Sequence, residues 1–211
     1  MLFSPLSYYI YNYKFYDRLY EKNGVYKALD RGDAKIITES VFDFFKNNEP
    51  FKSFKLKNSI NFFNENEISH LNDVRILLGR IMIVFYISAA LFIILLVLLF
   101  EKKYLFFLKN TALVLVTSSS ILLFFLISLY ILGNNFSGLF ESFHLVFFPQ
   151  GNWEFPQGAL IITIFPFGFF YDFFFRLLMS SFIISLILVV TGVVILTITN
   201  KIIKRRTLNG P

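Results

Sequence analysis

The sequence contains two histidines, His70 and His144, whose side chains are the clearest candidates for proton transfer. An imidazole has an unperturbed pKa of about 6.5, so at neutral pH it can either accept or donate a proton. Asp73 follows His70 by three positions, the spacing of one helical turn, and can orient the imidazole or favour a helix N-terminus. If the chain brings the two histidines together, they form a pair suited to general acid–base catalysis.

A polar turn follows His144 at residues 149–153, with the sequence PQGNW. The amide of Asn152 and the indole N–H of Trp153 can donate hydrogen bonds to a developing oxyanion. Tryptophan is also common at membrane–water interfaces, so an anchoring role for Trp153 stays open. We expect Asp73, Asn152 and Trp153 to support the histidines.

Composition excludes several other kinds of site. With no cysteine, the chain has no thiolate nucleophile, disulfide or thiolate zinc site. It has no glycine-rich phosphate-binding loop and no HExxH pattern, which makes a metalloenzyme built on His70, His144 and a carboxylate the weaker alternative. We expect neither a metal nor a cofactor.

A non-catalytic role is the other alternative. A histidine at a helix start near a bilayer is commonly an interfacial polar residue, so both histidines could be incidental in an envelope or transport-accessory protein. The long apolar stretches carry no ionisable residue, which argues against an ion-coupled transporter.

The elements that must position these residues are membrane helices. Hydrophobic residues make up 56% of the 211 residues, and they are concentrated in three uncharged stretches, 81–100, 111–132 and 177–198. Each holds the roughly 20 residues that cross a hydrocarbon layer of about 30 Å. The net charge of +6 comes from short clusters beside these stretches, which fits membrane lipids and not nucleic acid. The sequence predicts a mainly α, polytopic membrane helix bundle with a small extracytoplasmic domain.

Basic clusters orient this bundle in the plasma membrane. Lysine and arginine side chains gather at 101–109 and 201–206, which the positive-inside rule places in the cytosol. The outer loop 133–176 and the residues before the first span are then extracytoplasmic, so both histidines share the outer face. Residues 159–175 are also apolar, but Pro166 and Gly168 interrupt them, and we expect a segment buried at the outer boundary or re-entrant.

The remaining chain divides into an extracytoplasmic segment, 1–69, and a membrane domain, 70–211. Residues 1–13 resemble the end of a membrane helix, so we expect a fourth span upstream, with an interfacial tail as the alternative. Helical spacing of apolar residues predicts amphipathic helices at 14–22 and 36–46 that rest on the outer loop and the membrane surface.

Three smaller expectations concern local structure. Residues 51–63 alternate like an extended segment. Ser69 is the expected N-cap of the helix that enters the first span. Asp172 and Arg176 are spaced to form a structural ion pair near the start of the third span.

Two stretches of this sequence resemble the signatures of a family of bacterial integral membrane proteins that includes the lipoprotein intramolecular transacylase. Residues 62–75, FFNENEISHLNDVR, are similar to the first signature. Residues 143–153, FHLVFFPQGNW, followed by IFP at 164–166 and FYD at 170–172, are similar to the second. The similarity covers almost the whole chain, in order. It implies four membrane helices, a small extracytoplasmic domain and catalytic histidines at His70 and His144. This sequence departs from the family pattern at the first of the four helices, of which only the end is expected here.

The resemblance also implies a reaction. The sn-2 acyl chain of a diacylglyceryl-modified lipoprotein would move to the α-amine of its N-terminal cysteine, leaving a lyso-form lipoprotein. Because an ester becomes an amide, no ATP is needed, and the partners are the diacylated lipoprotein and membrane lipids. We expect His144 to be the base and His70, oriented by Asp73, to be the acid, although the residues also allow the reverse.

Overall fold

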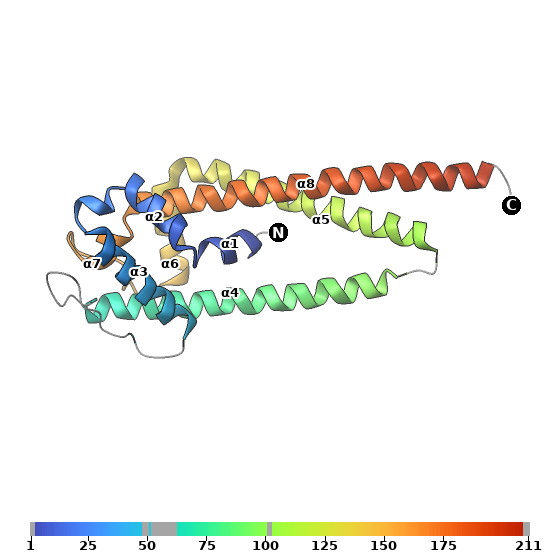
Figure 1. The fold of residues 1–211 in the computed structure, drawn as a ribbon. Coiled ribbons are helices and arrows are strands. Elements are labelled where there is room, and N and C mark those ends of the chain that lie inside the picture. The colour runs from blue at the N-terminus through green and yellow to red at the C-terminus, as the bar shows by residue number, and fades with distance from the viewer. Residues whose placement is uncertain (1–2, 48–50, 52–62, 101–102, 209–211) are drawn as a thin grey trace. The chain divides into compact units, whose positions relative to one another are not determined.

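The computed structural model describes residues 3–47, 51, 63–100 and 103–208, and every regular element within them is a helix (Figure 1). The chain forms two compact units. The histidine unit comprises Ser4–Ile83 and Gly133–Leu177 and contains both histidines. The span unit comprises Met1–Phe3, Val84–Leu132 and Leu178–Pro211.

Within the described residues, three helical segments are long and apolar enough to cross a membrane (Figure 1). They are α4 (Glu65–Leu98), the run Tyr104–Phe147 that begins with α5 (Tyr104–Leu132), and α8 (Phe167–Leu208). The second and third contain the predicted spans 111–132 and 177–198, and α4 covers the first, 81–100, as far as Leu98. The fold class predicted from composition, a helical membrane bundle, is therefore confirmed.

Small residues bring α5 and α8 together in the span unit. A Cβ at Gly192 would lie 2.7 Å from Val116 Cγ2 and 3.2 Å from the Ala112 carbonyl oxygen, so any larger residue would force α5 or its side chains to shift. Ser119 and Ser185 are also fully buried. Such contacts suit helices in lipid, where close backbone packing replaces the hydrophobic effect as the source of association.

The first part of the histidine unit folds as short helices. These are α1 (Phe3–Tyr9), α2 (Tyr13–Lys22), η1 (Val25–Lys27) and α3 (Arg31–Lys46). The amphipathic helices predicted at 14–22 and 36–46 are confirmed, and α3 begins earlier than predicted. Most of the extended segment predicted at 51–63 lies outside the described residues.

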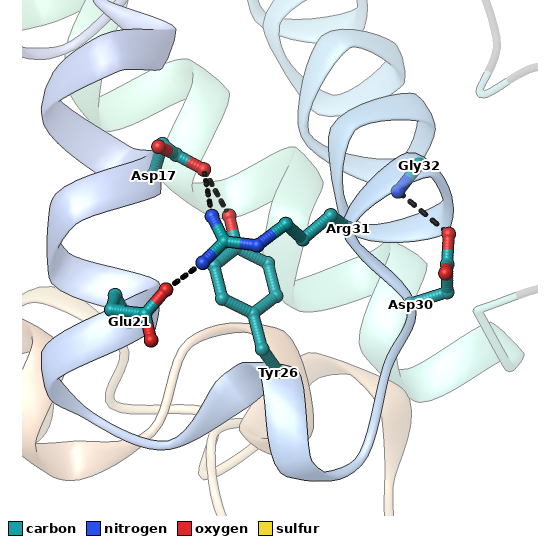
Figure 2. A network of polar contacts seen from close by, with 6 residues as sticks. All are labelled: Asp17, Glu21, Tyr26, Asp30, Arg31 and Gly32. Carbon is teal, nitrogen blue, oxygen red and sulfur yellow. Dashed lines mark hydrogen bonds and ion pairs between the residues drawn. The ribbon is translucent and has the colours of Figure 1, made fainter.

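A polar network joins α2 to the start of α3 (Figure 2). The Arg31 guanidinium pairs with Glu21 and lies 3.3 Å from Asp17 Oδ1. It also covers the Tyr26 ring at 4.2 Å, and the Tyr26 hydroxyl donates to Asp17 Oδ1 at 2.5 Å. Because the paired side chains are largely exposed, the network adds little to the stability of the helix pair.

The second part of the histidine unit is the outer loop, with η2 (Gly133–Asn135), α6 (Phe136–Phe147) and α7 (Leu160–Ile164). The apolar stretch at 159–175 breaks at Pro166, as predicted. Its second half is not a separate segment, because residues 167–175 are the first turns of α8.

One core joins the two parts of the histidine unit, which confirms that the N-terminal helices rest on the outer loop. Its buried side chains come from α2, η1, α3, the residues leading into α4, α4 itself, α7 and α8: Phe15, Tyr16, Leu19, Tyr20, Val25, Ala34, Ile37, Val41, Phe42, Phe44, Phe63, Leu71, Ile161, Ile164 and Phe169. Aromatic rings dominate this set and bury large areas in few residues.

Two local predictions are wrong. Ser69 is not the N-cap of α4, because the helix begins at Glu65. Asp172 does not pair with Arg176; it accepts from Lys22 Nζ at 2.5 Å and from Asn23 Nδ2 at 2.9 Å. The end of α2 lies against the start of α8, so a partner 150 positions away displaces the one nearby in sequence.

Candidate active site

The fold brings the two histidines together within the histidine unit. His70 lies in the early turns of α4 and His144 in the last turn of α6. Their ring centroids are 6.0 Å apart, with an interplanar angle of 22°. Both side chains are buried, with exposed fractions of 8% and 7%. Two imidazoles 74 positions apart in sequence therefore share one environment.

Aromatic side chains enclose this pair. Among the described residues, five rings have their centroids 4.2 to 5.6 Å from one of the imidazoles: Phe140, Phe143, Phe148, Trp153 and Phe155. Such surroundings exclude water and disfavour a charged imidazole. They also offer an apolar surface to an aliphatic chain.

The hydrogen bond of His144 determines its tautomer. Nδ1 lies 2.7 Å from the carbonyl oxygen of Phe140, one turn earlier in α6. A carbonyl oxygen can only accept, so Nδ1 carries the hydrogen and Nε2 keeps its lone pair. Burial lowers the pKa of His144, although the bond to Phe140 opposes that effect. At neutral pH, His144 thus presents Nε2 as a proton acceptor.

His70 is also held neutral. It lies before the uncharged stretch 81–100. Its pKa is lowered to about 4, mainly by burial and to a smaller extent by the nearby His144. The Asp73 charge and the Asn152 side chain act in the opposite direction. Nδ1 of His70 is buried and has no hydrogen-bond partner.

Asp73 connects the polar turn at residues 149–153 to α4 through hydrogen bonds. Its Oδ2 accepts from Gln150 Nε2 and from Asn152 Nδ2, both at 2.7 Å. Asn152 Nδ2 also donates to Ser69 Oγ at 3.1 Å. Gly151, with φ +77°, gives the turn a conformation that other residues rarely adopt. The sequence-predicted residues Asp73 and Asn152 therefore lie together beside the histidines.

Comparison with known proteins identifies the family of this chain. The sequence profile of the family described as lipoprotein intramolecular transacylase Lit matches residues 1–170. The chain belongs to the lipoprotein intramolecular transacylase family. No curated protein matches it. No solved structure matches it either. The resemblance seen in the sequence is confirmed, and with it a transacylase activity acting on lipoproteins.

For a lipoprotein intramolecular transacylase, donors to an oxyanion are of interest. Both hydrogens of Asn152 Nδ2 are directed to Asp73 and Ser69, so this amide has no further hydrogen to donate. The indole of Trp153, whose ring centroid is 4.8 Å from that of His144, remains as a donor close to the pair.

One buried carboxylate of this transacylase was not predicted from the sequence. Glu67, 2% exposed, accepts from the backbone N–H of Ile161 in α7 at 2.8 Å and from that of Asn64 at 2.7 Å. Asn64 Oδ1 in turn accepts from Glu67 N at 3.0 Å, forming a capping box. The Asn-x-x-Glu spacing could have revealed the box, but not the bond to α7. Glu67 thereby fixes the helical turn that precedes His70.

A metal site is a separate question. Among the described residues, no three His, Cys, Asp or Glu side chains are grouped to hold a metal ion.

Proposed function

We propose that this family member moves the sn-2 acyl chain of a diacylglyceryl lipoprotein to the α-amine of its N-terminal cysteine, leaving a lyso-form lipoprotein. The observation that carries the proposal is the buried imidazole pair, with centroids 6.0 Å apart, in an aromatic enclosure. Family membership supports transacylation of a lipoprotein. The positive-inside pattern supports a multi-pass protein of the plasma membrane with this site on the extracytoplasmic face.

The chemistry requires only proton transfers. The ammonium loses one proton, and the free amine attacks the ester carbonyl to form a C–N bond. The tetrahedral intermediate then loses a second proton from nitrogen, and the glycerol oxygen leaves with one. Ester and ammonium thus become amide, alcohol and one released proton. Because donor and acceptor belong to one molecule, holding them in place can supply about 7–11 kcal/mol of the barrier reduction.

His144 is the proposed base, since its Nε2 lone pair is available. Once protonated, His144 can also return a proton to the departing glycerol oxygen, so one imidazole can serve both steps. The low pKa of His70 favours a neutral ring at working pH. We therefore assign His70 to hydrogen bonding with the amine in place of the acid role expected from sequence. Trp153 is the proposed donor to the oxyanion.

The test is to express the chain in a bacterium that makes diacylated lipoproteins but does not N-acylate them. Transfer within one molecule conserves mass, so the product is distinguished by fragment ions and by loss of reactivity toward an amine-labelling reagent. Blocked amines with one acyl group on glycerol support the proposal. Free amines with both acyl groups on glycerol contradict it.

Variants assign the chemistry. H144A should reduce transfer by about 10²- to 10⁴-fold, the usual contribution of general acid–base catalysis. E141Q, which removes an exposed carboxylate from the same helix, is the matched control and should leave transfer unchanged. Full activity of H144A would refute the base assignment and favour an incidental histidine. Loss of wild-type activity with a strong chelator would instead favour a metalloenzyme.

A further inference from the structure

Asp73 is a carboxylate without a cation. Its hydrogen bonds come from the neutral amides of Gln150 and Asn152. No ion pair involves it within residues 3–47, 51, 63–100 and 103–208. Neutral amides leave the negative charge of Asp73 without a cationic partner, so this charge is available to a ligand.

Two unpartnered polar atoms lie in the same place. Nδ1 of His70 and Oδ1 of Asn152 are both buried and have no partner at hydrogen-bonding distance and angle, although the Asn152 side chain lies close enough to His70 to raise its pKa. The Asn152 amide is held through its nitrogen, which donates to Asp73 and Ser69, so its oxygen faces away from those acceptors. Buried polar atoms in folded proteins nearly always have partners, so these two indicate a ligand group that supplies hydrogen.

We infer that Asp73, Asn152 and His70 form a receptor for a primary ammonium group, the protonated N-terminus of the lipoprotein. An ammonium carries several N–H donors for His70 Nδ1 and Asn152 Oδ1, and a positive charge for Asp73. A water molecule or a hydroxyl group could satisfy the two acceptors but would leave the charge of Asp73 uncompensated. This inference rests on the proposed function, whose substrate has a free α-amine.

The receptor also gives the reaction an order. The amine would bind in its charged form beside Asp73 and then lose its proton to Nε2 of His144, whose ring is 6.0 Å from that of His70. An N-acylated lipoprotein lacks the positive charge, so the product would bind more weakly than the substrate.

The experiment compares two lipopeptides, both diacylated, one with a free α-amine and one with an N-acetyl group. Binding to the purified full chain is measured in lipid nanodiscs at pH 7. The wild type should prefer the free amine by about tenfold or more, and D73N should lose this preference. Both amides donate to one oxygen of Asp73, and asparagine retains an oxygen that can accept both, so D73N removes the charge without removing these bonds. E154Q, an exposed carboxylate in the same loop, is the control and should keep the preference.

A pH series separates charge recognition from a structural role. The α-amine has a pKa of about 7.7–8.0, so at pH 9 it is mostly neutral and the wild-type preference should fall toward that of D73N. Asp73 acts on His70 of α4, which lies beside His144 of α6. Arg75 and Glu154 are two positions along the chain from Asp73 and Asn152 and are the nearest other charges in the sequence. Burial lowers the pKa of both histidines, so neither changes charge between pH 7 and 9.

The outcomes distinguish the two proposals. If D73N prefers the free amine as strongly as the wild type, the receptor is refuted even where transfer occurs. If the preference depends on Asp73 but expression yields no N-acylated lipoprotein, the receptor stands and the transacylation proposal fails. A wild-type preference that persists unchanged at pH 9 also refutes recognition by charge.

Discussion

Replacing Glu67 by glutamine tests whether one buried carboxylate joins α4 to α7. The two oxygens of Glu67 accept from different backbone N–H groups, those of Ile161 and Asn64. Glutamine keeps one oxygen and turns an NH₂ group toward the other donor. One of the two bonds must therefore be lost, and a buried N–H then faces a second N–H.

The size of the effect follows from this geometry. A hydrogen bond to a charged group contributes about 1.5–3 kcal/mol, and Glu67 is only 2% exposed, so water cannot replace it. We expect E67Q to reduce the free energy of unfolding by that amount, which raises the unfolded fraction about 10- to 140-fold. E65Q is the matched control, because Glu65 is exposed in the same helical turn and should change stability by less than about 0.5 kcal/mol.

The chain provides its own probe for this measurement. Trp153 is the sole tryptophan and packs on His144 in the histidine unit, so its fluorescence reports unfolding of that unit. Denaturant titration of the purified protein in detergent should show a lower midpoint for E67Q than for the wild type and E65Q. Equal midpoints for all three proteins would refute the proposed role of Glu67.

Two further predictions use pH and packing. Because burial lowers the pKa of His70 and His144, the neutral base persists below pH 6.5. The transfer rate at saturating lipopeptide should therefore stay constant from pH 8 to 6.5 and fall only at lower pH. A fall in rate centred at pH 6.5 would contradict the effect of burial. G192A should lower the thermal unfolding temperature, because its Cβ would crowd α5. G79A should raise stability by about 0.5–1 kcal/mol, since its Cβ meets nothing within 4 Å. Equal effects of the two substitutions would refute the close contact between α5 and α8.

The sequence alone determined the class of this protein and the location of its spans. A membrane helix is defined by about 20 consecutive apolar residues, a local property that needs no knowledge of distant contacts. The amphipathic helices at α2 and α3 follow from equally local spacing. The two histidines stand out because so few other side chains in this composition can transfer protons near pH 7.

Only the tertiary structure decided which of these groups meet. Asp73 accepts from Asn152, 79 positions away, Glu67 from Ile161, 94 positions away, and Asp172 from Lys22, 150 positions away. Sequence spacing favoured near neighbours instead, such as Ser69 as a cap. These long-range pairs depend on how an aromatic core packs helices from both ends of the histidine unit, and packing is a property of whole surfaces that no short pattern records. The low pKa values of the imidazoles have the same origin, because burial is set by the residues that the fold gathers around them.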